Sequence, residues 1–127
     1  MEDNEIISKV TECVANALGR DEEEVKLESV LSRDLEAESI DYLDITFQLE
    51  KAFGIKIEKD ELFPQKIFQD ARYVSDGVVT ADGLAFLEQK LPYADIASFR
   101  VDPKVTAVPN LFTVSLLVNY VKTKIAA

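Results

Sequence analysis

The stretch DLEAESIDYLDITFQLEKAFG, residues 34–54, decides the fold. Apolar side chains return at helical spacing between positions 39 and 53, which predicts one helix over that range. Gly54 follows, at the position where a helix C-terminus favours a left-handed residue. The remaining elements are expected to pack around this helix.

The helix over 39–53 carries two apolar stripes. At about 100° per residue, one stripe contains Ile45, Leu49 and Phe53, and a nearly opposite one contains Ile40, Leu43 and Phe47. A surface helix of a small domain normally has one apolar face. One stripe must therefore face the core, and the other is either covered or open to a partner. The second stripe is bordered by Glu36, Glu38, Asp41, Asp44 and Gln48. An apolar strip rimmed by negative charge is a common recognition surface, although a helix buried on both sides remains the alternative.

Ser39 stands at the start of this helix. Serine is a favoured N-cap, so the simplest interpretation is that it caps the helix. A second interpretation concerns chemistry. A phosphate joined to its hydroxyl would lie near the free N–H groups and the positive end of the helix dipole, where an anion is favoured.

Three further helices are predicted on either side, over residues 4–18, 81–91 and 113–125. Gly19 is placed to end the first of them, and Thr80 and Thr113 are placed to begin the other two. We expect an all-α helical bundle that forms a single domain over residues 1–127.

Composition removes much of the enzyme repertoire. The 127 residues include no His and one Cys, Cys13. A Ser-His-Asp triad, a Cys-His pair and a His-ligated metal site are therefore excluded, and we expect no metal centre. A single cysteine forms no disulfide framework, and its place beside the first helix's apolar stripe predicts a buried core residue.

Charge is unevenly distributed. Residues 1–63 hold 18 acidic and 7 basic side chains, whereas residues 64–127 hold 6 and 7. The net charge of −10 argues against binding nucleic acid or an anionic membrane, and no apolar run is long enough to span a bilayer. The acidic N-terminus does not resemble a secretory signal, so we expect a cytoplasmic protein. The anionic half predicts a basic partner.

Residues 34–63, DLEAESIDYLDITFQLEKAFGIKIEKDELF, resemble the central segment of an acyl carrier protein. That family has an Asp-Ser-Leu motif at the start of its second helix, an acidic helix face and an exit of the Phe-Gly type leading to Ile-x-Ile. The outer helices are similar too, so the resemblance covers roughly residues 1–63 and 110–127.

The resemblance implies a carrier rather than an enzyme. Ser39 matches the serine that receives 4'-phosphopantetheine from coenzyme A through a phosphopantetheinyl transferase. The matching partner-recognition positions are Glu36, Glu38, Ile40, Asp41, Leu43, Asp44 and Phe47. The implied partners also include acyl-loading and acyl-transfer enzymes with basic docking surfaces, and the chain is expected to be a monomer without membrane insertion.

The sequence departs from the family pattern in three places. Glu38 replaces the usual Asp before the serine, and Ile40 replaces the usual Leu after it. The largest departure is an insert at about 64–109, whose apolar content predicts a folded, mostly helical segment. It either extends the core, or enlarges or covers the acyl-binding side, or narrows the choice of partner. By analogy of layout, the resemblance implies a specialised carrier, for example of unusual fatty acids of lipopolysaccharide.

Two other functions stay open. An aminoacyl or peptidyl carrier uses the same serine and arm. An unmodified helical interaction module would use the acidic strip alone, with Ser39 only as a cap. A calcium site is disfavoured because no segment has the alternating ligands of an Asp-x-Asp-x-Asp-Gly loop.

Overall fold

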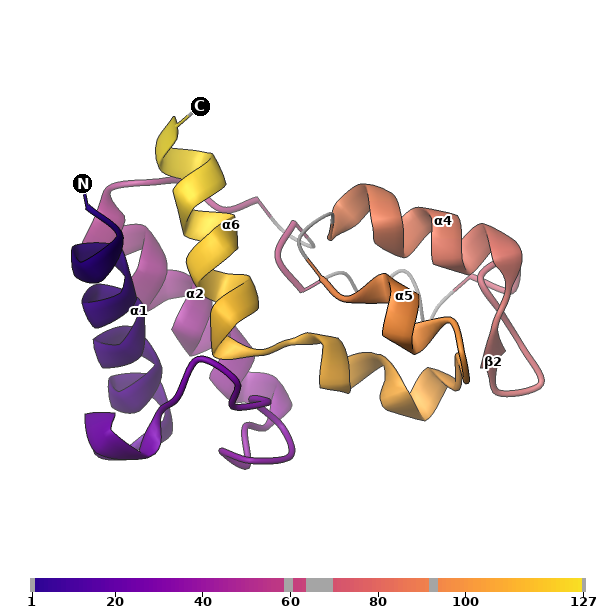
Figure 1. Cartoon of the computed structure of the whole chain (residues 1–127), viewed down its shortest axis with the longest axis horizontal. Helices are drawn as coiled ribbons and strands as arrows, with labels where there is room; N and C mark the ends of the chain where they lie inside the picture. Colours follow the sequence, from indigo (N-terminus) through magenta and orange to yellow (C-terminus); the bar gives the residue numbers. More distant parts are fainter. Residues whose placement is uncertain (1, 59–60, 64–69, 92–93, 127) are drawn as a thin grey trace.

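Three helices form the main bundle in the computed structural model of the chain (Figure 1). They are α1 (Asp3–Leu18), α2 (Ser39–Phe53) and α6 (Val114–Ala126), and a 3₁₀ turn, η1 (Glu22–Glu24), follows α1. The contacts of α1 with both α2 and α6 hold the three together. The structure describes residues 2–58, 61–63, 70–91 and 94–126.

The ends of the main helices follow the sequence signals. Gly19 and Gly54 end α1 and α2 in the left-handed conformation, with φ of 65° and 62°. Thr113 begins α6, because its Oγ1 accepts a hydrogen bond from the Leu116 N–H at 3.1 Å. The predicted helices over 4–18, 39–53 and 113–125 are thereby confirmed to within a residue.

The insert forms a side lobe beside the main bundle, made of residues 70–112 as far as the structure describes them (Figure 1). Its elements are β1 (Val74–Ser75), β2 (Val78–Val79), α4 (Ala81–Lys90), α5 (Ile96–Phe99) and the 3₁₀ helix η2 (Val105–Leu111). The segment is folded and mostly helical, as predicted, and Thr80 caps α4 through the Gly83 N–H. Positions 64–69 of the predicted insert lie outside the described residues.

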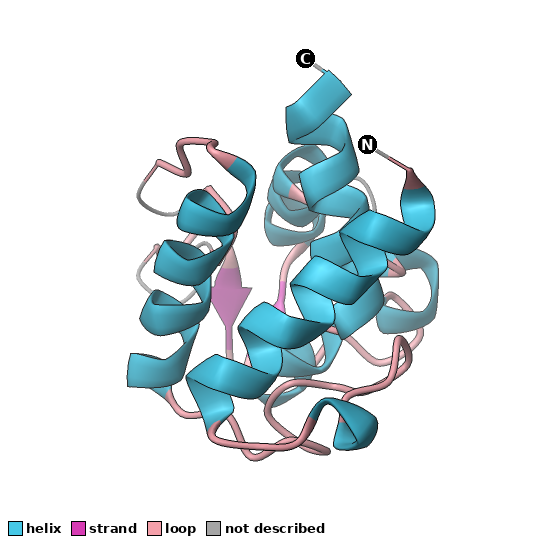
Figure 2. Ribbon diagram, turned by 90° about the vertical axis from the view of Figure 1, so that its left-hand side faces the viewer, coloured by secondary structure: helices cyan, strands magenta, loops and turns pink. Residues whose placement is uncertain are grey.

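A small antiparallel hairpin is the exception to the all-helical prediction (Figure 2). Val74 pairs with Val79 and Ser75 pairs with Val78, around a turn at Asp76 and Gly77. The sequence indicates the Asp-Gly turn, but strands of two residues are too short to show an alternating pattern. The chain is therefore mostly helical, with one short hairpin among the described residues.

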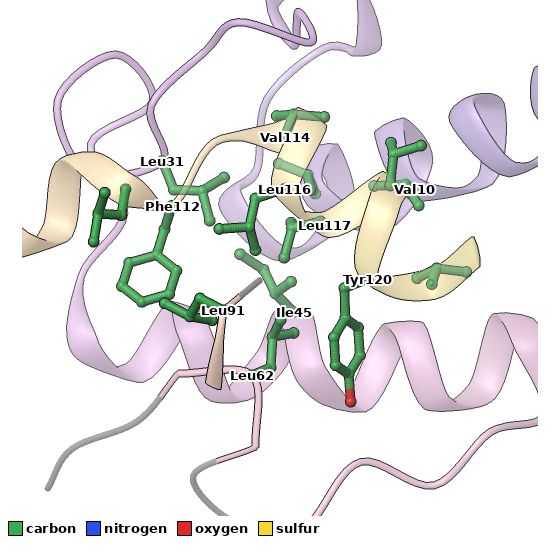
Figure 3. Close-up of a cluster of buried hydrophobic side chains, with 14 of the residues drawn as sticks. Val10, Leu31, Ile45, Leu62, Leu91, Phe112, Val114, Leu116, Leu117 and Tyr120 are labelled. Carbon is green, nitrogen blue, oxygen red and sulfur yellow. The ribbon is translucent and has the colours of Figure 1, made fainter. Parts of the chain in front are cut away.

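One continuous hydrophobic core runs through the main bundle and the side lobe. Figure 3 shows α6 side chains packed with residues of other elements: Val10, Leu31, Ile45, Leu62 and Leu91. At the joint between the two parts, the ring of Phe63 lies 4.7 Å from that of Tyr42 and 5.1 Å from that of Phe112, centroid to centroid. The insert thus extends the core, which was one of its expected roles.

The turn at 61–63 is tied to α6 by one carboxylate. Glu61 accepts hydrogen bonds from the Tyr120 hydroxyl and from Lys124 Nζ, the latter at 2.8 Å. Burial by itself raises the pKa of Glu61, but the bonds from Lys124, Tyr120 and the Glu58 backbone together hold that pKa below its usual value.

We expect Glu61→Gln to reduce the free energy of unfolding by about 1 kcal/mol at pH 7, since a charge-assisted pair is lost. The pKa of Glu61 is lower in the folded chain than in the unfolded chain. The stabilisation that the Glu61 carboxylate provides is therefore complete above its unfolded pKa, and it is lost as the pH falls through its folded pKa. Urea titrations between about pH 3 and 7 should therefore show the two proteins converging in acid. A constant difference at all pH values would contradict this account. Glu28→Gln, at an exposed position, is the matched control.

Candidate functional site

The helix α2 begins at Ser39, the predicted modification residue. Glu38 is the N-cap, so the interpretation of Ser39 as the cap is wrong. The reason is local. The Glu38 N–H donates to Asp41 Oδ2 at 2.8 Å, and the Asp41 N–H donates to the Glu38 carbonyl at 2.9 Å. Ser39 therefore occupies the first helical position, and its side chain lies outside what the structure describes.

The second apolar stripe of α2 is open to solvent. Ile40 is 72% exposed, Leu43 57% and Phe47 55%, and we call these three residues the α2 strip. On the opposite side Ile45 and Leu49 are fully buried. The alternative of a helix buried on both sides is thereby excluded, and the side lobe does not cover the strip. Single exposed apolar residues are ordinary, but these three lie on one helix face and form an exposed apolar strip.

Negative charge borders the α2 strip. Glu36, Glu38 and Asp44 are exposed, while Asp41 is half-buried and already bound to the Glu38 N–H. Glu36 pairs with Arg20, and several acids of the side lobe likewise pair with nearby bases: Asp70 with Arg72, Glu88 with Arg100, and Asp102 with Lys104. The exposed acids beside the α2 strip therefore give this surface negative charge.

A groove of about 640 Å³ lies between α1 and α2, beside the α2 strip. Phe47, Asp44 and the buried Cys13 are among the residues that line it. Burial, and then Glu12, raise the pKa of the Cys13 thiol to about 11. The thiol donates to the Gln48 carbonyl at 3.5 Å, so Cys13 is a protonated core residue, as predicted. The sequence did not predict the groove, because it depends on how two distant helices pair.

The start of α2 has the general features by which a helix N-terminus favours an anion. The first N–H groups of a helix have no partner within the helix, and the dipole there favours an anion. Within the described ranges, no three potential metal-ligating side chains lie together. No helix in the same ranges is long and apolar enough to cross a membrane.

The fold and this site have the features of a class, the small helical carriers: a serine stands at the start of an acidic, partly apolar helix. Comparison with known proteins agrees. Residues 8–66 match the family model described as a phosphopantetheine attachment site. The chain is 43% identical over 61 residues to the acyl carrier protein of Rubrobacter xylanophilus, a match that covers 48% of this chain and 75% of that protein. It is 37% identical over 71 residues to that of Petrotoga mobilis, covering 56% and 84%.

The chain therefore belongs to the acyl carrier protein family. Members of this family are carriers rather than enzymes, and they bear a covalently attached 4'-phosphopantetheine. Such a carrier interacts with a phosphopantetheinyl transferase and with acyl-handling enzymes. The match over 8–66 ends where the insert begins, so the side lobe is an addition to the matched part.

Proposed function

We propose that Ser39 carries the 4'-phosphopantetheine arm and that the chain presents acyl groups, as thioesters on that arm, to enzymes of lipid biosynthesis. The observation that carries this proposal is the place of Ser39. It is the first residue of α2, within the matched range, one residue before the exposed α2 strip. An enzyme that docks on the strip thereby has the attachment point beside it.

The chain's own contribution to the chemistry is to hold and orient the arm. The arm supplies the thiol that bears the acyl group. The serine hydroxyl provides the oxygen of the phosphodiester, and the start of α2 favours its negative charge. Cys13 is not needed for the thioester, and its buried, protonated thiol does not compete for the acyl group.

Partner recognition is proposed for two kinds of side chain. Ile40, Leu43 and Phe47 supply the apolar contact, and the surrounding acids Glu36, Glu38, Asp41 and Asp44 attract basic docking surfaces. The acidic residues of this group have different roles. Asp41 also holds the start of α2 through the Glu38 N–H, whereas Asp44 is exposed and takes no part in that cap. A substitution at Asp44 therefore tests the effect of charge without disturbing the start of α2.

We expect Asp44→Lys to slow modification by a phosphopantetheinyl transferase about tenfold at low salt, because electrostatic attraction speeds the encounter. The effect should shrink to less than about twofold near 0.5 M salt, where the Debye length is a few ångströms. Initial rates at several salt concentrations measure this. Glu28→Lys makes the same change at an exposed position outside α2. Equal rates for the two variants at low salt would contradict recognition through α2.

The cargo is proposed from the relatives and the layout. The relatives are acyl carrier proteins, which favours an acyl over an aminoacyl cargo. The folded side lobe supports a specialised carrier, for example of unusual fatty acids such as those of lipopolysaccharide, that acts as a monomer in the cytoplasm. Offering the modified chain to an acyl-activating and to an amino-acid-activating enzyme separates the two cargoes. Thioester formation by the second enzyme alone would overturn the acyl proposal.

A further inference from the structure

Arg20 reaches from the end of α1 into the segment that leads to Ser39. Its side chain is only 25% exposed. Its Nε–H donates to the Leu35 carbonyl at 3.1 Å, and its terminal nitrogens lie 2.8 Å from Glu24 and 3.6 Å from Glu36. One guanidinium therefore binds a main-chain oxygen and a carboxylate of two consecutive residues shortly before the proposed attachment point.

The residue held in this way has an unfavourable backbone conformation. Glu36 has a φ of 59°, in the left-handed region that residues with a Cβ adopt at a cost. Elsewhere the described chain places Gly19, Gly54 and Gly77 at such positions, together with one other residue that has a Cβ, Asp76. After Glu36 the chain changes direction. The Ala37 N–H donates to the Leu31 carbonyl at 2.9 Å, and the next residue is the N-cap of α2.

We propose that Arg20 is a positioning residue for modification at the start of α2. By binding Leu35 and Glu36 it holds the left-handed turn, and the turn sets the direction in which α2 begins. Arg20 acts through the backbone and does not touch the reacting atoms. The inference rests on the proposed function, since the turn leads directly to Ser39, the proposed attachment residue.

The first test compares Arg20→Gln with Arg33→Gln in the full chain. Arg33 is a matched control, because it is 64% exposed and its ion pair among the described residues is with its neighbour Asp34. If only a fraction of the variant molecules holds the left-handed turn, the apparent affinity of the transferase for the chain falls in proportion to that fraction. We therefore expect Arg20→Gln to raise KM for the transferase about tenfold with kcat changed less than twofold, as for loss of a charge-assisted bond. Arg33→Gln should leave both constants unchanged.

The second test is rescue by glycine. Glu36→Gly also removes a proposed recognition acid, so the double variant is compared with Glu36→Gly alone. Because Gly adopts the left-handed conformation at little cost, Arg20→Gln should change KM less than about twofold in the Glu36→Gly background. A general loss of stability would raise KM little in a folded sample, and it would not be corrected at that one residue. A rise of about tenfold in KM when Arg20→Gln is added to Glu36→Gly would contradict the positioning role.

The third test needs no modification. Amide exchange at Ala37 and Glu38 should rise about tenfold in Arg20→Gln, while buried amides such as Leu49 exchange at the native rate. If Arg20→Gln exchanges faster but the native chain accepts no arm, Ser39 is not the attachment point. The turn would still depend on Arg20 in that case. Equal exchange and equal KM for the Arg20 and Arg33 variants would overturn the role of Arg20. Faster exchange with native KM would overturn its link to modification.

Discussion

Ser39→Ala abolishes attachment of the 4'-phosphopantetheine arm. Alanine has no hydroxyl to provide the phosphodiester oxygen, so the expected effect is complete loss rather than a slower rate. The substitution should leave the fold intact, because Ala is a good helix former and Glu38, not Ser39, caps α2. The measurement is the intact mass of each protein after incubation with coenzyme A and a broad-specificity transferase. The native chain should gain the mass of one arm and the variant none.

Ser8→Ala is the matched control for this loss, since Ser8 is an exposed serine on another helix, α1. It should gain the arm at the native rate. A mass gain by Ser39→Ala would place the arm on another residue. No gain by a folded native chain with several transferases would favour an unmodified interaction module.

Leu43→Gln removes the central contact of the α2 strip. Leu43 is 57% exposed in the free chain, so its apolar surface contributes when a partner covers it. Burial of a leucine side chain is worth about 1.5–3 kcal/mol, which predicts a loss of about 10- to 100-fold in kcat/KM for the transferase. The free energy of unfolding should change by less than about 0.5 kcal/mol, because Gln is a good helix former and the site is open.

Val78→Gln makes the same kind of change on the side lobe, where Val78 is 43% exposed. It should leave kcat/KM near the native value if the partner docks on α2. Losses of equal size in the two variants would move the docking surface to the side lobe or spread it across both. A native rate in Leu43→Gln would show that the α2 strip makes no productive contact.

The periodicity of α2 predicted the most important features of the site. Two opposite stripes in the sequence correspond to buried Ile45 and Leu49 on one side and exposed Leu43 on the other. The glycine that ends the helix was also predictable, because Gly54 has the left-handed φ of 62° that glycine permits. These features depend on the spacing of neighbouring residues, which a single sequence contains.

Features that depend on distant residues were not predicted. The bond from Arg20 to Leu35 and the Tyr42–Phe63–Phe112 joint bring together segments that no local pattern connects. The N-cap was misassigned for a different reason. Serine's capping preference is a statistical tendency, and here the Asp41 carboxylate binds the Glu38 N–H and moves the helix start by one residue.

The most direct test of the central claim is to locate the arm on the native chain purified from the cells that produce it. Peptides from a digest of the intact protein, fragmented in a mass spectrometer, assign an added mass to a single residue. The account predicts one 4'-phosphopantetheine on Ser39, the first residue of α2. An arm on any other residue, or a chain that carries none in those cells, would contradict it.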